Sequence, residues 1–244
     1  LMPQGRIGVA PNEETLPEIL KTRGYSCGMV GKWHLGHLYP FLPLQQGFDE
    51  YLGLPYSNDM WPFHPQPGHP YRALPLYDNE RVVEYNPTVN HMTTRITERA
   101  TAFIDKHKNE PFLLYVPYTQ PHVPLGVSDK FKGKSGEGLY ADVIMEIDWS
   151  VGEIMKTLKE NGLDDHTLVL FTSDNGPWLS YGNHGGSTGG LREGKGTTFE
   201  GGQRVPFIAR MPGRIPAGKV SGQFLSALDI TPTIVELTGS QMPR

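Results

Sequence analysis

The sequence predicts an α/β fold in which a mixed, mostly parallel sheet lies between layers of helices. Segments with helical periodicity alternate along the chain with short apolar segments of strand length. The 244 residues include 29 Gly and 22 Pro, a proportion that indicates long ordered loops between these elements. The chain is long enough to bury one large hydrophobic core, and it shows no repeat or linker. We therefore expect one domain over residues 1–244.

The first part of the chain predicts a helix, a strand and a long loop. Residues 13–22 carry apolar side chains on one helical face, and the apolar residues 25–30 have the length of a strand. Residues 38–90 are rich in Pro, Tyr and Gly and show no sustained period, so we expect a loop there. Loops of this length in a compact domain usually contribute to function.

The rest of the chain predicts three helices and three strands. Residues 142–161 give the strongest helical pattern, with Ile144, Ile147 and Leu158 on the apolar face, and Asn161-Gly162 ends it. The most apolar strand is 167–172, which we expect to be buried and central in the sheet. The other expected elements are helices at 91–108 and 227–237 and strands at 112–116 and 205–209.

Composition excludes several classes of protein. A formal net charge of −4 argues against a nucleic-acid partner, which usually meets a basic surface. No apolar run approaches the roughly 20 residues of a membrane span. The single cysteine, Cys27, rules out an internal disulfide or a multi-cysteine metal site, and its apolar neighbours predict a small core residue.

The hexapeptide Gly-Lys-Trp-His-Leu-Gly at residues 31–36 places a cation and an imidazole two residues apart, directly after the first strand. On an extended chain, Lys32 and His34 would point to one face and Trp33 to the other. Such a pair at the carboxyl end of a strand suits an oxyanion such as a sulfate or phosphate ester. The alternative is a buried strand end with a lysine whose ammonium reaches solvent.

Two further polar clusters follow predicted strands. His122 lies between Pro121 and Pro124 in a stiff segment, although a lone loop histidine is more often simply solvated. Asp174 and Asn175 follow the most apolar strand and offer a carboxylate and an amide oxygen, which are hard ligands for Ca²⁺ or Mg²⁺. The alternative is a plain turn, because Asp, Asn and Gly all favour turns. Two ligands cannot complete such a metal site.

Glycines on both sides of Lys195 form the fourth cluster. Backbone can approach an anion closely there, and the lysine can act as a point charge. The segment is not a phosphate-binding P-loop, because the required Gly-x-x-x-x-Gly-Lys-Ser/Thr spacing fails at Gly196. The alternative is a flexible surface loop.

Together these clusters resemble the sulfatase family of the alkaline-phosphatase-like superfamily, and in order and spacing its arylsulfatase A branch. The resemblance covers nearly the whole chain. The matching segments are residues 24–36, 46–49, 55–59, 120–124, 173–176 and 190–202.

The resemblance implies a catalytic role for each cluster. It implies that Lys32 and His34 contact the sulfate and the nucleophile, and that His122 and Lys195 contact the ester oxygens and help protonate the leaving group. It also places Ser57 near the sulfate. Asp174 and Asn175 would ligate one divalent cation, usually Ca²⁺, with Mg²⁺ as the alternative. A metal with several fixed cations would stabilise the charge that develops as a sulfate ester breaks.

Two features of the family are absent from these 244 residues. The family's nucleophile is a formylglycine made from a Cys/Ser-x-Pro-x-Arg motif, and no such motif occurs. The tandem N-terminal aspartates that complete the metal site are also missing. Residues 2–8 resemble the stretch after the nucleophile motif, and residues 237–239 resemble the close of the catalytic domain. We therefore expect a sulfatase catalytic domain truncated at both ends, inactive or nearly so by itself.

Function remains open between three hypotheses. The first is hydrolysis of a small-molecule or glycan sulfate ester, which implies a formylglycine-generating maturation enzyme as a partner of the parent protein. The others are hydrolysis of phosphate or phosphonate esters and non-catalytic binding of sulfated glycans. In the long loop, Asp59, Trp61, His64 and Tyr71 would line the mouth of the pocket. By resemblance the parent protein would be periplasmic, secreted or lysosomal.

Overall fold

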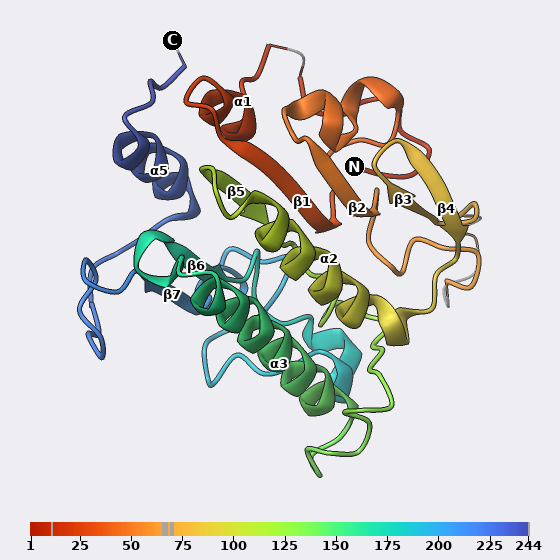
Figure 1. Ribbon diagram of the computed structural model, residues 1–244. Helices are drawn as coiled ribbons and strands as arrows, with labels where there is room; N and C mark the ends of the chain where they lie inside the picture. The colour runs from red at the N-terminus through yellow and green to blue at the C-terminus, as the bar shows by residue number, and fades with distance from the viewer. Residues whose placement is uncertain (11, 65–67, 69–70, 244) are drawn as a thin grey trace. The chain divides into compact units, whose positions relative to one another are not determined.

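The chain forms two compact units in the computed structural model shown in Figure 1. The structure describes residues 1–10, 12–64, 68 and 71–243. The first unit comprises Leu1–Thr119 and Gly222–Arg244, and the second unit comprises Gln120–Ser221. Each unit is described by itself below, and a single catalytic domain over residues 1–244 stays a prediction.

A five-stranded mixed sheet forms the centre of the first unit, in the order β4-β3-β2-β1-β5. Strand β1 (Ser26–Lys32) pairs in parallel with β2 (Glu50–Leu54) on one side and β5 (Phe112–Tyr115) on the other. Strands β3 (Pro75–Asp78) and β4 (Arg81–Tyr85) extend the sheet in the antiparallel sense. A mixed sheet flanked by helices confirms the predicted fold class.

Helices cover both faces of this sheet. Alternate residues of β1 point to opposite faces, so Cys27 and Met29 pack with Leu20 of helix α1 (Leu16–Lys21). Helix α5 (Ile230–Thr238) lies on this same face. On the other face, Gly28 meets the Phe103 ring of helix α2 (Met92–His107), which runs along the sheet in Figure 1. The absence of a side chain at Gly28 lets α2 approach closely.

The predicted loop over residues 38–90 is wrong in part, because it contains β2, β3 and β4. Strands β3 and β4 form a hairpin whose turn includes Asn79 at a left-handed φ of 55°. The Asn79 side chain and amide both bond the backbone of Tyr51, which ties the hairpin to β2. These strands are held by pairing with other segments of the chain, and their sequences show no clear alternation of polar and apolar residues. Short 3-10 helices also lie at Tyr39–Phe41, Pro43–Gln46 and Val89–His91.

The second unit contains helix α3 (Leu139–Glu160), a short helix α4 (Glu200–Gln203) and a two-stranded sheet. Strand β6 (Val169–Thr172) pairs with β7 (Phe207–Arg210) in the antiparallel sense. The prediction that residues 167–172 form a buried central strand is therefore wrong for this structure: β6 has no second partner among the described strands, and Phe171 is 38% exposed. An apolar run alone does not show what will cover it. Further 3-10 helices lie at Asp164–His166, Leu179–His184 and, in the first unit, Ala227–Asp229.

Helix α3 confirms the predicted helix, and Ile147 and Leu158 of the predicted apolar face are buried. Ile144, predicted on the apolar face, is 42% exposed, whereas Asp142 and Glu146 are buried. The Asp142 carboxylate accepts hydrogen bonds from the Ser135 hydroxyl at 2.6 Å and from the backbone N–H of Ser135 and Gly133. These bonds, led by the Ser135 hydroxyl, lower the pKa of Asp142. The periodicity of apolar residues could not predict the burial of Asp142 and Glu146, because both are carboxylates.

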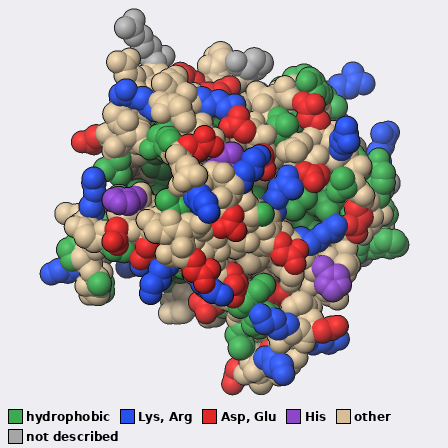
Figure 2. All heavy atoms as spheres, viewed as in Figure 1, with side chains coloured by type: hydrophobic (Ala, Val, Ile, Leu, Met, Phe, Trp, Pro, Cys, Tyr) green, Lys and Arg blue, Asp and Glu red, His purple; other side chains and the backbone are tan. Residues whose placement is uncertain are grey.

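The surface carries both signs of charge. On the face shown in Figure 2, Lys and Arg side chains are interspersed with Asp and Glu rather than gathered in one patch. Among the residues that the structure describes, no helix is long and apolar enough to cross a membrane.

Gly53 provides a test of the β1–β2 packing. A Cβ at Gly53 would lie 1.7 Å from the carbonyl oxygen of Gly31, its partner across the two strands. We expect Gly53→Ala to lower the free energy of unfolding by about 1–3 kcal/mol, because backbone must move to admit the methyl group. Chemical denaturation measures the change.

Gly152 gives the matched control. It lies within α3, and nothing comes within 4 Å of a Cβ placed there. Gly152→Ala should raise stability by up to about 1 kcal/mol through helix propensity alone. Equal effects of the two substitutions would contradict the packing described for β1 and β2.

Candidate functional site

Lys32 lies at the carboxyl end of β1, as predicted, and tight backbone packing holds it there. Its amide donates a hydrogen bond to the carbonyl oxygen of Pro117 at 2.8 Å. The preceding Gly31 has a φ of 138°, and a Cβ there would lie 2.0 Å from the same oxygen. Only glycine fits at that position, so Lys32 projects from a constrained segment of chain.

His34 lies close to Lys32, but the chain is not extended as far as His34. Its φ is 59°, a left-handed conformation that is uncommon outside glycine. The backbone amide of His34 donates to Pro55 at 3.1 Å, and its ring Nε2 bonds the carbonyl oxygen of Leu1 at 3.0 Å. Because a carbonyl only accepts, Nε2 carries the proton and Nδ1 the lone pair of the neutral ring. Trp33 turns away into the core against Phe48, as predicted.

Burial lowers the pKa of His34 below its ordinary value of 6.5, and the nearby Lys32 cation lowers it further. Asp59 acts in the opposite direction, but more weakly. At pH 7 the His34 imidazole is therefore neutral, and the positive charge of this pair resides on Lys32.

Ser57 and Asp59 follow β2 and complete the group of predicted residues in the first unit. Both are buried, and the Asp59 carboxylate lies 4.0 Å from Nε2 of His64. The Tyr56 ring packs edge-on against His34 at 6.3 Å between centroids. The structure thus brings Lys32, His34 and residues 56–59 together at one end of the β1–β2 pair.

Cys27 plays no part in this group. Its side chain is fully buried in the core with Met29 and Leu20, as predicted. Burial raises the pKa of the thiol to about 12, so Cys27 stays protonated and is neither a nucleophile nor a metal ligand.

In the second unit, two glycine-containing loops pack backbone to backbone. The Gly176 amide donates to the carbonyl oxygen of Gly202 at 2.9 Å, and the Lys195 amide donates to that of Pro177 at 2.8 Å. A Cβ at Gly176 would lie 1.8 Å from the carbonyl oxygen of Gly201. These contacts bring the segment after β6, with Asp174 and Asn175, against the loop that carries Lys195. Lys195 is half-buried, which argues against a flexible surface loop.

Lys195 and His122 meet at the indole of Trp178. The Lys195 Nζ lies 4.9 Å from the centroid of the Trp178 ring, and the His122 ring lies 5.6 Å from it at 65°. The Nδ1–H of His122 donates to the carbonyl oxygen of Val123 at 2.7 Å, which orients the imidazole. The two X-Pro bonds that flank His122, before Pro121 and Pro124, are both cis.

The side chains that follow β6 offer oxygen atoms, the type of ligand that a hard divalent cation prefers. Asp174 is an exposed carboxylate and Asn175 a half-buried amide, and both offer oxygen atoms. A calcium ion takes six to eight oxygen ligands, so this pair supplies only part of a coordination shell. Among the described residues, no group of three or more His, Cys, Asp or Glu could hold a metal ion.

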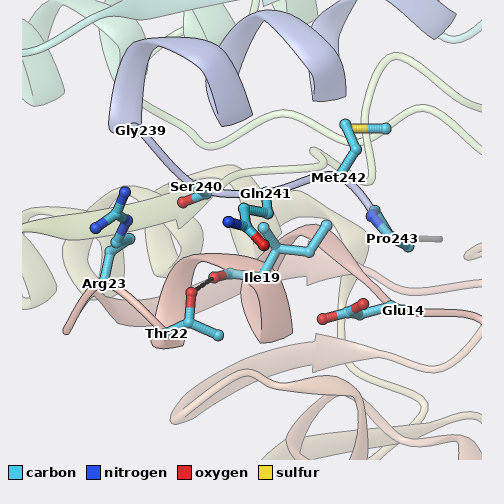
Figure 3. A pocket seen from close by; sticks show the side chains of 9 residues that line it. All are labelled: Glu14, Ile19, Thr22, Arg23, Gly239, Ser240, Gln241, Met242 and Pro243. Atoms are coloured by element: carbon cyan, nitrogen blue, oxygen red, sulfur yellow. Dashed lines mark hydrogen bonds between the residues drawn. The ribbon is translucent and has the colours of Figure 1, made fainter.

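A pocket of about 440 Å³ lies elsewhere in the first unit, between α1 and the segment that follows α5. Figure 3 shows Glu14 and Arg23 at opposite ends of it, with residues 239–243 along one side. The Thr22 hydroxyl donates a hydrogen bond to the carbonyl oxygen of Ile19. None of the predicted site residues lines this pocket.

The chain belongs to the sulfatase family, whose pattern it matches over residues 2–240. It is similar to arylsulfatase G of Mus musculus, with 38% identity over 97% of this chain and 51% of the relative. It is also similar to N-acetylgalactosamine-6-sulfatase of Canis lupus familiaris, with 42% identity over 99% of this chain and 48% of the relative. The chain spans about half the length of these relatives.

The fold is that of the solved structure of PsFucS1 sulfatase from Pseudoalteromonas sp., which superposes with a TM-score of 0.88 at 27% identity over 98% of this chain and 53% of that one. The structure of Ps i-CgsB in complex with k-i-k-neocarrahexaose superposes with a TM-score of 0.85 at 31% identity, covering all of this chain and 57% of that one. The resemblance to arylsulfatases and the α/β fold are thereby confirmed. The roles of Lys32, His34, Ser57, His122, Asp174, Asn175 and Lys195 stay predictions.

The pKa of His34 can be tested by removing its neighbour. In Lys32→Gln, the pKa of His34 should rise because one of its two main causes is lost. It should remain below 6.5, because burial persists. NMR titration of the His34 ring protons measures it, with His91 as an internal reference. An unchanged or lower pKa would show that the ammonium does not act on this ring.

Proposed function

We propose that the protein carrying this chain hydrolyses sulfate esters. The observation that carries the proposal is the match to the sulfatase family over residues 2–240. The matched range includes the predicted site residues of the first unit and those of the second unit. The names of the relatives include both arylsulfatases and a sugar sulfatase, which supports a small-molecule or glycan sulfate ester as the substrate.

The residues of each group supply a distinct part of this chemistry. Lys32 and Lys195 provide point charges for the sulfate oxygens, on which charge builds up as the ester bond breaks. Because Nδ1–H of His122 is bonded to the carbonyl oxygen of Val123, Nε2 carries the lone pair of the neutral ring. His122 would therefore give a proton to the leaving oxygen from Nε2 as the imidazolium. His34 is neutral at pH 7 and would act as a hydrogen-bonding group rather than a cation. Ser57 would contact the sulfate from the segment after β2.

Two groups outside the chain are part of the proposal. Asp174 and Asn175 would hold Ca²⁺, or Mg²⁺, which would polarise a sulfate oxygen as a Lewis acid. The nucleophile would be a formylglycine supplied by residues outside these 244, since they contain no Cys/Ser-x-Pro-x-Arg motif. A formylglycine-generating enzyme would then be a partner of the parent protein. A periplasmic, secreted or lysosomal location is part of the same proposal.

The first experiment assays the mature protein that carries this chain. Lys195→Ala and His122→Ala should each lower kcat/KM for a sulfate ester by about 100-fold or more, because each removes a charge or proton donor. Lys219→Ala, an exposed lysine of the same unit, is the control and should leave kcat/KM unchanged.

A substrate panel separates the three hypotheses. Turnover of aryl and sugar sulfates above the matching phosphates supports the proposal. Faster turnover of phosphate or phosphonate esters would replace it with the second hypothesis. Binding of a sulfated glycan with no turnover in a correctly matured protein would favour the third.

Metal dependence gives a second prediction. Chelation should abolish turnover and added Ca²⁺ or Mg²⁺ should restore it. Asp174→Ala should weaken the apparent metal affinity by about 10-fold or more, because it removes the one carboxylate among the two ligands. The exposed Asp165 of the same unit serves as control, and Asp165→Ala should not change the metal requirement. Full activity of the Asp174 variant without added metal would contradict the assignment.

A further inference from the structure

Trp178 occupies a central place among the predicted catalytic groups of the second unit. It lies three residues after Asn175, on the segment that follows β6. Its ring contacts the His122 imidazole, the Lys195 ammonium and the Tyr181 ring, the last at 4.6 Å. One side chain therefore touches two groups that come from segments more than 70 residues apart in sequence.

Hydrogen bonds and close packing restrain the main chain from which the indole projects. The carbonyl oxygen of Trp178 accepts from the Tyr181 amide at 3.1 Å, and a Cβ at Gly185 would lie 2.2 Å from that same oxygen. The backbone N–H of Lys195 donates a hydrogen bond to the carbonyl oxygen of Pro177, the residue before Trp178. This bond holds the Lys195 backbone close to Trp178. The main chain at Trp178 and the main chain at Lys195 are thus held close together.

The chemistry of these contacts suits a positioning role. A Trp face attracts a cation through its quadrupole, and Trp is the strongest of the aromatic side chains in this respect. A lysine has four flexible methylenes, so a ring that attracts the ammonium restricts where it lies. An edge-to-face contact likewise restricts the tilt of the His122 ring. A smaller aliphatic side chain would provide neither interaction.

We propose that Trp178 is a positioning residue that orients the His122 imidazole and the Lys195 ammonium relative to each other. This inference rests on the proposed function, because it assigns His122 and Lys195 to the leaving group of a sulfate ester. Misplacing a proton donor slows esters with basic leaving groups most, since an activated phenolate departs without a proton. The loss in a Trp178 variant should therefore depend on the leaving group.

The test compares Trp178→Leu with Trp178→Phe in the mature protein. For an alkyl or sugar sulfate, Trp178→Leu should lower kcat/KM by about 100-fold, against about 10-fold for 4-nitrophenyl sulfate. Trp178→Phe keeps an aromatic face and should recover most of the loss. If Trp178 had only a structural role, its loss would reduce the fraction of active protein and lower kcat/KM for both substrates by the same factor. This outcome would overturn the proposal.

Trp149 supplies a matched control in the same unit. Its ring lies 3.9 Å from the Nζ of Lys130, a comparable cation–π contact that involves none of the predicted catalytic residues. Trp149→Leu should leave the ratio of the two rates unchanged. An equal change in that ratio would also overturn the proposal.

NMR gives a readout that does not depend on turnover. The His122 ring proton resonances should shift in Trp178→Leu, because the ring current of the indole is lost, and should shift less in Trp178→Phe. Unchanged resonances would overturn the proposal.

A wild-type protein that cleaves phosphate but not sulfate esters would overturn the proposed function alone, and the leaving-group comparison then uses alkyl and aryl phosphates. A protein that cleaves neither overturns both.

Discussion

Close contact between backbone segments at glycine residues positions the polar residues of both units. In the first unit, Gly31 and Gly53 face each other across β1 and β2, and neither has room for a side chain. In the second unit, Gly176 lies against Gly201 in the same way. Each contact involves a glycine that is next to a predicted site residue in the chain: Lys32 follows Gly31, and Asn175 precedes Gly176. Polar groups at strand ends are thus held by packing that contains no side chain.

Electrostatics then differentiates residues of similar type. Burial and the Lys32 cation keep His34 neutral, whereas His122 is oriented by a backbone carbonyl and an aromatic ring. Cys27, in the interior of the same strand as Lys32, is made inert by burial. The second unit uses buried carboxylates in a different way, since Asp142 organises the loop before α3 through three hydrogen bonds. Burial and hydrogen bonding therefore set the charge state of each of these groups: His34 is neutral, the Cys27 thiol is protonated and Asp142 is ionised.

Sequence reasoning succeeded where a pattern is local. The periodicity of residues 91–108 predicted α2, and its residues Ile96 and Phe103 are buried. It failed for residues 38–90, where β2 and its hairpin partners depend on pairing between distant segments. It also overstated the burial of β6, because hydrophobicity does not reveal which neighbour covers a strand. The place of Trp178 between His122 and Lys195 carried no sequence signal.

The α/β class, the sulfatase resemblance and the set of candidate residues could be predicted from the sequence, because motifs and periodicity are properties of neighbouring positions. Three features came from contacts in the folded chain: the left-handed conformation of His34, the burial of Asp142 and Glu146 on α3, and the shared contact of His122 and Lys195 with one indole. Each of these depends on atoms that are distant in the chain. The anion-binding role of residues 31–36 stays a prediction, and the geometry of their lysine and histidine depends on Pro117, Pro55 and Leu1.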